Sequence, residues 1–166
     1  MERMNPDYKP HLEKARSEKK RHRALLNRLK KSPPKDLDAT VHALHEEAFS
    51  NIDCLQCANC CATTSPRFTG KDIERLARHL RMKPGAFIEQ YLVIDEEGDY
   101  VFPAAPCPFL GADNYCSVYE ARPQACRAYP HTDRRKFHQA LGVTDANTRI
   151  CPAVAQIVDQ LHTVYP

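Results

Sequence analysis

Four cysteines form the run Cys54, Cys57, Cys60 and Cys61, with the spacing C-x2-C-x2-C-C. Two-residue spacings let successive thiolates converge on one centre, while backbone N–H groups of the short loop can point at the sulfurs. The first three cysteines copy the opening of a ferredoxin-type run, but the next thiol is immediately adjacent. Because neighbouring side chains diverge on an ordinary backbone, we expect Cys60 and Cys61 to serve different positions, or one of them to bridge two metals.

The other four cysteines lie further along the chain, at Cys107, Cys116, Cys126 and Cys151. A proline follows Cys107 and Cys151, which fixes the backbone just past the sulfur and predicts ligands at turns. The separations are long, so any site closes only in the folded domain. Eight thiols divide into two four-coordinate sites, or into one four-thiolate site with reserve cysteines, and the sequence leaves both partitions open.

The ligand type limits the metal. Thiolates exclude the hard, oxygen-preferring ions and leave zinc and iron–sulfur clusters. The C-x2-C-x2-C run favours an iron–sulfur cluster, whereas the scattered remainder suits zinc equally well. Either kind of four-cysteine site is negatively charged, so cations should accompany it, and the alternative use of such cations is to bind an anionic substrate. The arginines placed for this are Arg122, Arg127, Arg134 and Arg135.

Composition and the first residues of the chain limit which other classes of protein are possible. The five glycines stand alone in the sequence, which excludes the clustered glycine turns of Rossmann and P-loop sites. There is no run of about 18 apolar residues, and residues 1–6 lack the apolar core of a signal peptide. We therefore expect a soluble, cytoplasmic protein without a membrane contact, in which a disulfide framework is disfavoured because cytosolic thiols stay reduced.

Charge is distributed unevenly. Residues 1–35 carry twelve Lys or Arg against four Asp or Glu, whereas residues 36–166 carry twelve against seventeen. The sequence thus predicts a basic N-terminal helical arm, residues 1–35, and a cysteine-cluster metal-binding domain, residues 36–166. We expect the arm to be a solvated helix that docks loosely on the domain, with contact to nucleic acid or an acidic protein through residues 9–31 as the alternative.

Helical periodicity dominates the elements that must position the thiols, and a helix with a thin apolar stripe is expected over residues 10–31. An amphipathic helix from residue 37 leads into Cys54, a capping box at residues 69–72 opens another, and further helices begin at Pro84 and Pro152. The segments 92–94 and 100–102 predict a β-hairpin around a glycine-containing turn. The expected fold is mainly α with short β-hairpins, a small α+β domain organised by metal and preceded by the basic helix.

Three histidines lie close to the cysteine motifs. We interpret His42 and His45 as packing residues, because a lone histidine on an amphipathic helix is more often that than a ligand. His131 is the residue to test for acid–base chemistry, although no catalytic residue is assigned.

The cysteine motifs resemble those of the YkgJ-type CxxCxxCC cysteine-cluster family, whose domain is named for zinc or iron chelation. The resemblance covers residues 37–161 and includes the eight cysteines, Arg122-Pro123, Arg127 and Tyr129-Pro130. It implies metal or cluster binding by Cys54, Cys57, Cys60, Cys61, Cys107, Cys116, Cys126 and Cys151. Members often carry the label Fe–S oxidoreductase, which is not a demonstrated reaction.

Three functions remain open. The leading hypothesis is an iron–sulfur cluster held by thiolates, with a redox role. The alternatives are a zinc-organised binding module whose basic arm contacts nucleic acid or an acidic partner, and a zinc or iron delivery protein.

Overall fold

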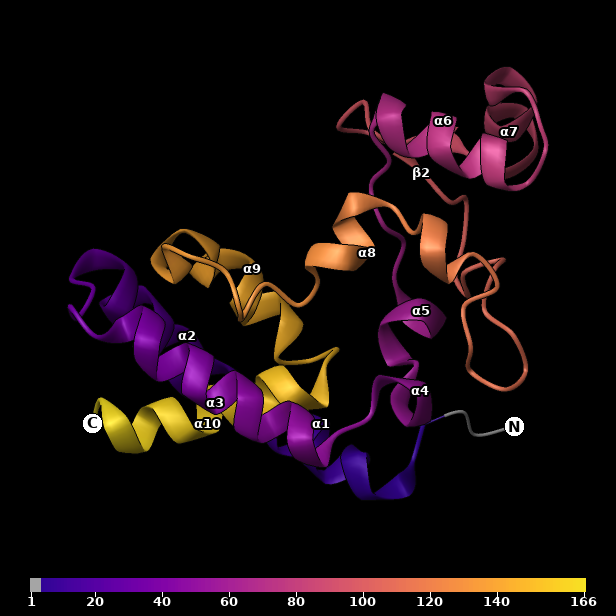
Figure 1. The fold of residues 1–166 in the computed structure, drawn as a ribbon. Coiled ribbons are helices and arrows are strands. Elements are labelled where there is room, and N and C mark those ends of the chain that lie inside the picture. The colour runs from indigo at the N-terminus through magenta and orange to yellow at the C-terminus, as the bar shows by residue number, and fades with distance from the viewer. Residues whose placement is uncertain (1–3) are drawn as a thin grey trace. The chain divides into compact units, whose positions relative to one another are not determined.

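The computed structural model describes residues 4–166, and the chain forms two compact units. The first joins the described residues up to Cys57 with Pro130–Pro166, and the second is Ala58–Tyr129. The fold is mainly α with one short antiparallel β-hairpin, as the sequence predicted (Figure 1).

The first unit is entirely helical in the part that the structure describes. Its α-helices are α1 (Lys9–Ser17), α2 (Lys19–Lys31), α3 (Leu37–Asn51), α4 (Cys54–Cys57), α9 (Leu141–Asn147) and α10 (Pro152–Val164), and its 3-10 helices are η1 (Pro6–Tyr8) and η3 (Phe137–Ala140).

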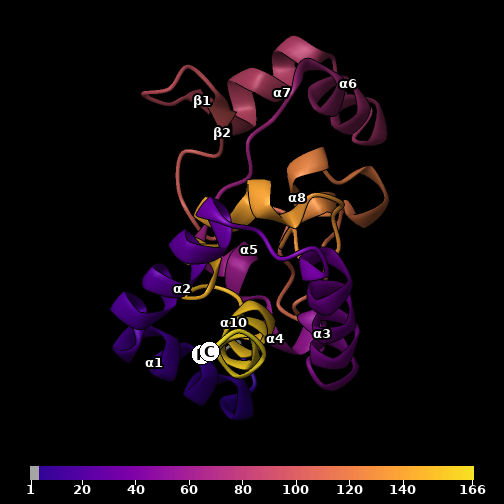
Figure 2. The same cartoon turned by 90° about the vertical axis from the view of Figure 1, so that its left-hand side faces the viewer.

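Helix α10 is the centre of this unit and packs against α1, α2, α3 and α9. Viewed nearly along its axis, α10 has α3 on one side and α1 on the other (Figure 2). It begins with Pro152 in the first turn, a position that needs no backbone N–H, and Ile157, Val158 and Leu161 are fully buried. The predicted helix that begins at Pro152 is therefore confirmed.

The basic N-terminal segment is part of this core. Two helices replace the expected single helix, because Glu18 leaves helical geometry and is at once the C-cap of α1 and the N-cap of α2. Leu12, Leu26 and Leu29 are each 2% exposed, so the expectation of a loosely docked helix is wrong. The few apolar side chains of these helices are almost completely buried. Each therefore contributes nearly the full hydrophobic free energy that its apolar surface allows.

Polar contacts add to this packing. Lys14 Nζ lies 2.6 Å from Asp159 Oδ2 on α10, and Arg23 Nη2 lies 3.0 Å from Asp145 Oδ2 on α9. Arg28 donates to the carbonyl oxygens of the last two residues. Some basic side chains of α1 and α2 thus form ion pairs and hydrogen bonds within the first unit.

The second unit contains short elements connected by ordered loops. They are α5 (Asn59–Thr63), α6 (Gly70–His79), α7 (Pro84–Tyr91), β1 (Val93–Ile94), β2 (Tyr100–Val101), η2 (Tyr119–Ala121) and α8 (Gln124–Ala128). β1 pairs antiparallel with β2, and Gly98 takes the left-handed conformation (φ 83°) in the turn between them. The predicted hairpin and the helix start at Pro84 are both confirmed.

Aromatic rings fill the core of the second unit. Phe68, Phe87, Phe102 and Phe109 are buried, and Phe68 and Phe102 meet edge to face with centroids 4.8 Å apart. Helix α6 contributes Ile73, Leu76 and Ala77 to this core. Cys107 and Cys116 pack against the same cluster, so these two thiols border the core of the second unit.

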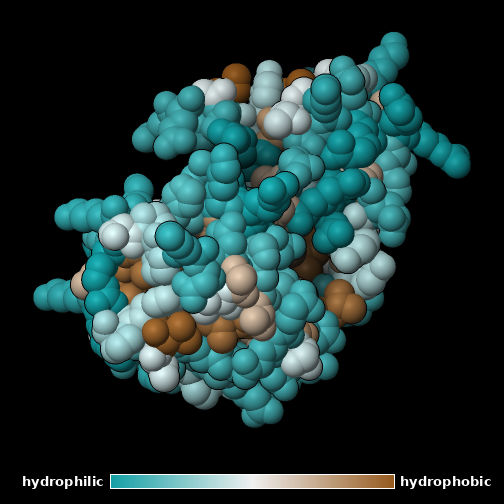
Figure 3. Space-filling view, turned by 60° about the vertical axis from the view of Figure 1, so that its left-hand side comes forward, coloured by the Kyte–Doolittle hydropathy of each residue, from teal (hydrophilic) through white to brown (hydrophobic). Residues whose placement is uncertain are grey.

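The surface drawn in Figure 3 is mostly hydrophilic, with hydrophobic residues in small separate groups. Single exposed hydrophobic side chains are normal on globular proteins. No helix in the described part of the chain combines the length and the apolar character needed to cross a membrane.

Candidate metal centre

The eight cysteines all lie in the described part of the chain, and none of them forms a disulfide there. Cys54, Cys57 and Cys151 belong to the first unit, and the second unit holds the other five: Cys60, Cys61, Cys107, Cys116 and Cys126. The thiols of each unit are described separately below.

Four thiols of the second unit interact with one another electrostatically. The pKa of Cys126 is raised to about 12, mainly by burial and also by negative charge on Cys61, Cys107 and Cys116. The pKa of Cys107 is raised to about 11, mainly by burial, with Cys61 and Cys116 contributing to the increase. Thiols from three segments of the unit therefore repel one another as thiolates, which a bound cation relieves. No three cysteine sulfur atoms of the described chain lie within 4.8 Å of one another.

Cys61 differs from the other three. Its pKa is lowered to about 7, mainly by the hydrogen bond with the thiol of Cys60 and also by the charge of Arg122, against the effect of burial. The two sulfur atoms lie 4.0 Å apart. Neighbouring side chains were expected to diverge, but the turn of α5 brings these sulfurs together.

Backbone groups hold the loop that carries Cys107 and Cys116. The N–H of Cys107 donates to the carbonyl of Cys61 at 2.8 Å, which joins two distant parts of the chain. N–H groups of Phe109 and Leu110 interact with the sulfur of Cys107 and oppose the effect of burial on its pKa. N–H groups directed at sulfur favour a thiolate, as expected for a ligand loop.

Asp72 fixes the start of the helix that carries Cys126. Its carboxylate accepts from the Thr69 backbone N–H at 2.9 Å, completing the predicted capping box of α6. The other oxygen accepts from the backbone N–H of Gln124 at 3.0 Å and from Arg75 at 2.6 Å. Burial would raise the pKa of Asp72, but these hydrogen bonds lower it overall. One side chain thus caps α6 and anchors α8.

Arginines of the R-P-x-x-C-R segment are bound to the backbone around the thiols. Arg122 lies over the ring of Tyr119 at 3.6 Å, and its charge lowers the pKa of Cys61 and opposes the rise at Cys116 and Cys126. Arg127 donates to the carbonyl oxygens of Glu120 and Arg122. Arg122 therefore supplies the positive charge expected beside the thiols, while Arg127 fixes the turn.

The other two arginines of that expectation belong to the first unit. Arg134 Nη2 lies 3.4 Å from Gln139 Oε1, and Arg134 Nε lies 3.4 Å from the carbonyl oxygen of Arg135. These contacts are with neighbouring residues of the same segment.

The other three thiols lie in the first unit. The pKa of Cys151 is raised to about 12, mainly by burial and also by negative charge on Cys57 and Cys54. Cys151 is the N-cap residue of α10, and the N–H groups of Val154 and Ala153 oppose this rise. Cys57 is buried in the hydrophobic core of the unit, whereas Cys54 is exposed.

The histidines near the motifs support the loop that precedes η3. His42 Nε2 lies 3.0 Å from the carbonyl oxygen of Arg134, and His45 Nδ1 lies 2.7 Å from Thr132 Oγ1. Both are packing residues in this arrangement, as the sequence indicated. His131 adopts a left-handed backbone conformation (φ 71°), and burial and the charge of Arg134 lower its pKa.

The comparison with protein families agrees with the donor set. Residues 53–152 match the CxxCxxCC family, described as "Putative zinc- or iron-chelating domain". The match spans more than half of the chain and includes all eight cysteines, so the chain belongs to this family. No curated protein and no solved structure matched the chain.

One polar cluster was missed at the level of sequence. Ligand atoms of Glu18, His22 and Asp159 lie within 4.8 Å of one another in the first unit. The spacing of Glu18 and His22, four residues apart, places both side chains on one face of a helix and was the available signal. The structure buries His22 among the apolar residues of α2, where its ring contacts that of His162 on α10.

Proposed function

We propose that this metal-binding domain holds an iron–sulfur cluster through cysteine thiolates and that the cluster has a redox role. The observation that carries the proposal is the family match over all eight cysteines, and the electrostatic coupling of Cys61, Cys107, Cys116 and Cys126 within the second unit supports it. The full proposed ligand set is Cys54, Cys57, Cys60, Cys61, Cys107, Cys116, Cys126 and Cys151.

The donor chemistry fits such a group. The thiols of Cys61, Cys107, Cys116 and Cys126 provide sulfur donors alone, which suit iron–sulfur clusters and zinc and do not suit magnesium or calcium. Arg122 offsets the negative charge that four thiolates bring into a partly buried site. A bound cluster would supply one-electron transfer, and the residues around it would set its potential through charge, N–H groups and burial.

Zinc is the second candidate, and the short distance between Cys60 and Cys61 favours it. In tetrahedral zinc–thiolate sites the bond length implies sulfur atoms about 3.8 Å apart. The observed separation of 4.0 Å is close to that value. With zinc, the domain would be a structural module or would carry zinc to another protein.

Anaerobic purification with metal and sulfide analysis distinguishes the two. The proposal predicts a brown protein with broad visible absorption and iron matched by acid-labile sulfide. A colourless protein that retains stoichiometric zinc under the same conditions would overturn the iron–sulfur assignment and support the second candidate.

Single serine substitutions test the grouping of the ligands. Cys126→Ser should remove the metal of the second unit and leave the thiols of the first unit protected from alkylation. Ala128→Ser, in the same helix, is the matched control because it adds a hydroxyl without removing a thiol. Full metal content in Cys126→Ser would show that Cys126 is not a ligand.

A further inference from the structure

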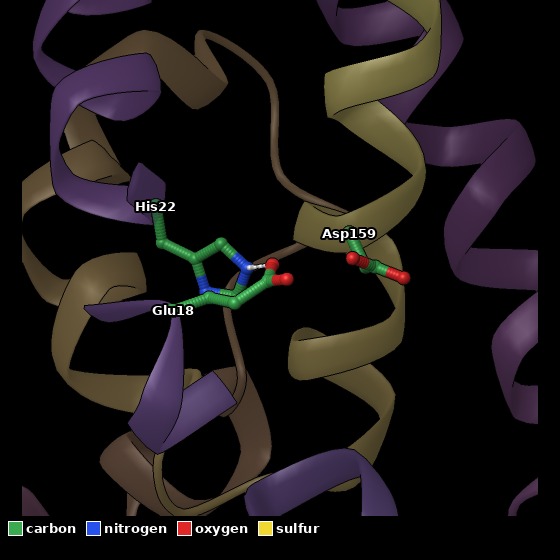
Figure 4. A group of neighbouring side chains, drawn as sticks. All are labelled: Glu18, His22 and Asp159. Carbon is green, nitrogen blue, oxygen red and sulfur yellow. Dashed lines mark ion pairs between the residues drawn. The ribbon is translucent and has the colours of Figure 1, made fainter. Parts of the chain in front are cut away.

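A second group of potential metal ligands lies in the first unit and contains no cysteine. Glu18 stands at the junction of α1 and α2, His22 lies in α2, and Asp159 lies in α10 (Figure 4). One ligand atom from each residue lies within 4.8 Å of the other two. An ion could contact all three atoms with small side-chain movements.

His22 provides the second, independent observation. Its side chain is 1% exposed, and neither ring nitrogen has a hydrogen-bond partner. The nearest acidic atom is Glu18 Oε2, 3.5 Å from Nε2, as the dashed line in Figure 4 shows. Buried polar atoms are nearly always satisfied, so two unsatisfied nitrogens on one buried ring point to a missing ligand.

His162 lies beside this group of three, outside the 4.8 Å that joins its atoms, and offers a fourth donor. It lies three residues after Asp159 on α10, and its ring centroid is 5.4 Å from that of His22. Its Nε2 is buried and also lacks a hydrogen-bond partner. Burial lowers the pKa of His22 and of His162, which favours the neutral ring that a metal ligand requires.

We propose that Glu18, His22, Asp159 and His162 bind one divalent transition-metal ion, for which Zn²⁺ is the best match. Two imidazoles and two carboxylates form a four-ligand set suited to zinc, whereas magnesium and calcium prefer oxygen ligands alone. The ion would join the junction of α1 and α2 to α10. It would also satisfy one ring nitrogen of His22 and Nε2 of His162, which have no hydrogen-bond partner in the folded chain.

Each of the two carboxylates already forms an ion pair with a basic side chain through one oxygen. Lys14 Nζ lies 2.6 Å from Asp159 Oδ2, and Arg21 Nη1 lies 2.8 Å from Glu18 Oε2. Both basic side chains are more than half exposed, so these ion pairs are weak and the two cations can turn into solvent when an ion binds. Removing one competitor should therefore strengthen metal binding, and Lys14→Met should raise the affinity about two- to fivefold.

The test uses the full chain with its cysteine-bound metal in place. Zn²⁺ is titrated at pH 7.5 by calorimetry, and bound metal and protected thiols are counted in the same samples. We expect one further equivalent of zinc with no change in the number of protected thiols. The proposal is overturned if the wild-type chain takes up no further equivalent, and a change in thiol protection would assign that equivalent to the cysteines instead.

A pair of double variants assigns the site. Glu18→Gln with Asp159→Asn removes both carboxylates while keeping side-chain shape, and the further equivalent should disappear. Glu13→Gln with Glu46→Gln removes two negative charges from exposed positions of the same unit and should leave it unchanged. Equal uptake by both double variants, or loss in both, contradicts the proposal.

A spectroscopic measurement does not depend on a variant that folds. Adding Zn²⁺ should shift the imidazole resonances of His22 and His162 and leave those of His42 and His45 in place. Shifts confined to other histidines would overturn the assignment. His22→Gln adds a second check where it folds, because it should lose the further equivalent while its thiols stay protected.

Discussion

The first unit buries aliphatic side chains around α10, whereas the second buries a small aromatic core beside thiols from three segments. Long helices in the first unit satisfy their own backbone and bring many apolar residues together. Helices of five to ten residues in the second unit contribute fewer core residues and need local anchors such as Asp72. From this comparison we predict that the first unit is stabilised mainly by its core and that bound metal stabilises the second.

Removal of the thiol-bound metal should give the largest difference in stability between the two units. Stripping thiol-bound metal under reducing conditions should destabilise the second unit by on the order of 10 kcal/mol, because the binding free energy of a structural site is folding free energy. Hydrogen exchange should then show loss of amide protection in α6 and α8, with protection retained in α3 and in the C-terminal half of α10. Equal loss in both units would show that the two do not differ in this respect.

Truncation of a core side chain in the first unit should lower stability without loss of metal. Ile157→Ala should lower the free energy of unfolding by about 2–5 kcal/mol, because Ile157 is fully buried and truncation leaves a cavity. The metal content of the folded protein should not change. Val164→Ala, at an exposed position of the same helix, is the control and should cost less than about 0.5 kcal/mol. Both values come from chemical denaturation followed by circular dichroism.

The anchor of α8 tests how the second unit positions a ligand. Asp72→Asn should cost about 1–3 kcal/mol, because it weakens the hydrogen bonds to Thr69, Arg75 and Gln124 in a buried site. It should also accelerate release of metal to a chelator, since Cys126 lies in the helix that Asp72 holds. Glu74→Gln, on the exposed face of α6, should alter neither quantity.

Acid should produce the smallest effect, and it should fall on the first unit. The pKa values of His22 and His162 are lowered by burial, so the unfolded chain binds protons at a higher pH than the folded chain does. Their contribution to stability is complete above the unfolded pKa of about 6.5 and declines as pH falls toward the lower folded pKa values. Charged groups facing the pair are Glu18, Arg21, Asp145 and Asp159.

Unfolding curves between about pH 7 and pH 5, without added zinc, measure this decline. His22→Leu should flatten it, because the variant has no ring to protonate. The window lies above the range in which Asp38 and Asp72 gain protons, since both have lowered pKa values. An unchanged pH dependence in His22→Leu would contradict the assignment to this ring.

Local signals in the sequence predicted local structure well. The capping box at Thr69 and Asp72, the turn at Gly98 and the start of α10 at Pro152 each depend on chemistry within a few residues. Expectations that failed depend on contacts between distant segments. The spacing of Leu12 and Leu26 predicted a stripe, but only the position of α10 shows that the stripe is fully covered.

The same limit applies to the candidate sites. The sequence predicts all eight cysteines as metal ligands, because the two-residue spacing that begins their pattern is rare without a metal. It left their grouping open, since the separation from Cys61 to Cys107 and Cys126 does not determine which loops meet. The pairing of His22 with Asp159 could not be predicted either, because it requires two helices from opposite ends of the chain.

The burial of Cys57 has a consequence for tolerance to substitution. Its side chain belongs to the hydrophobic core of the first unit, while Cys54 three residues earlier is exposed. A buried cysteine packs as a small apolar residue whether or not it binds metal. Saturation mutagenesis scored on folding alone should therefore accept alanine or valine at position 57 and nearly any residue at position 54, and only a screen on metal content would rank the two positions alike.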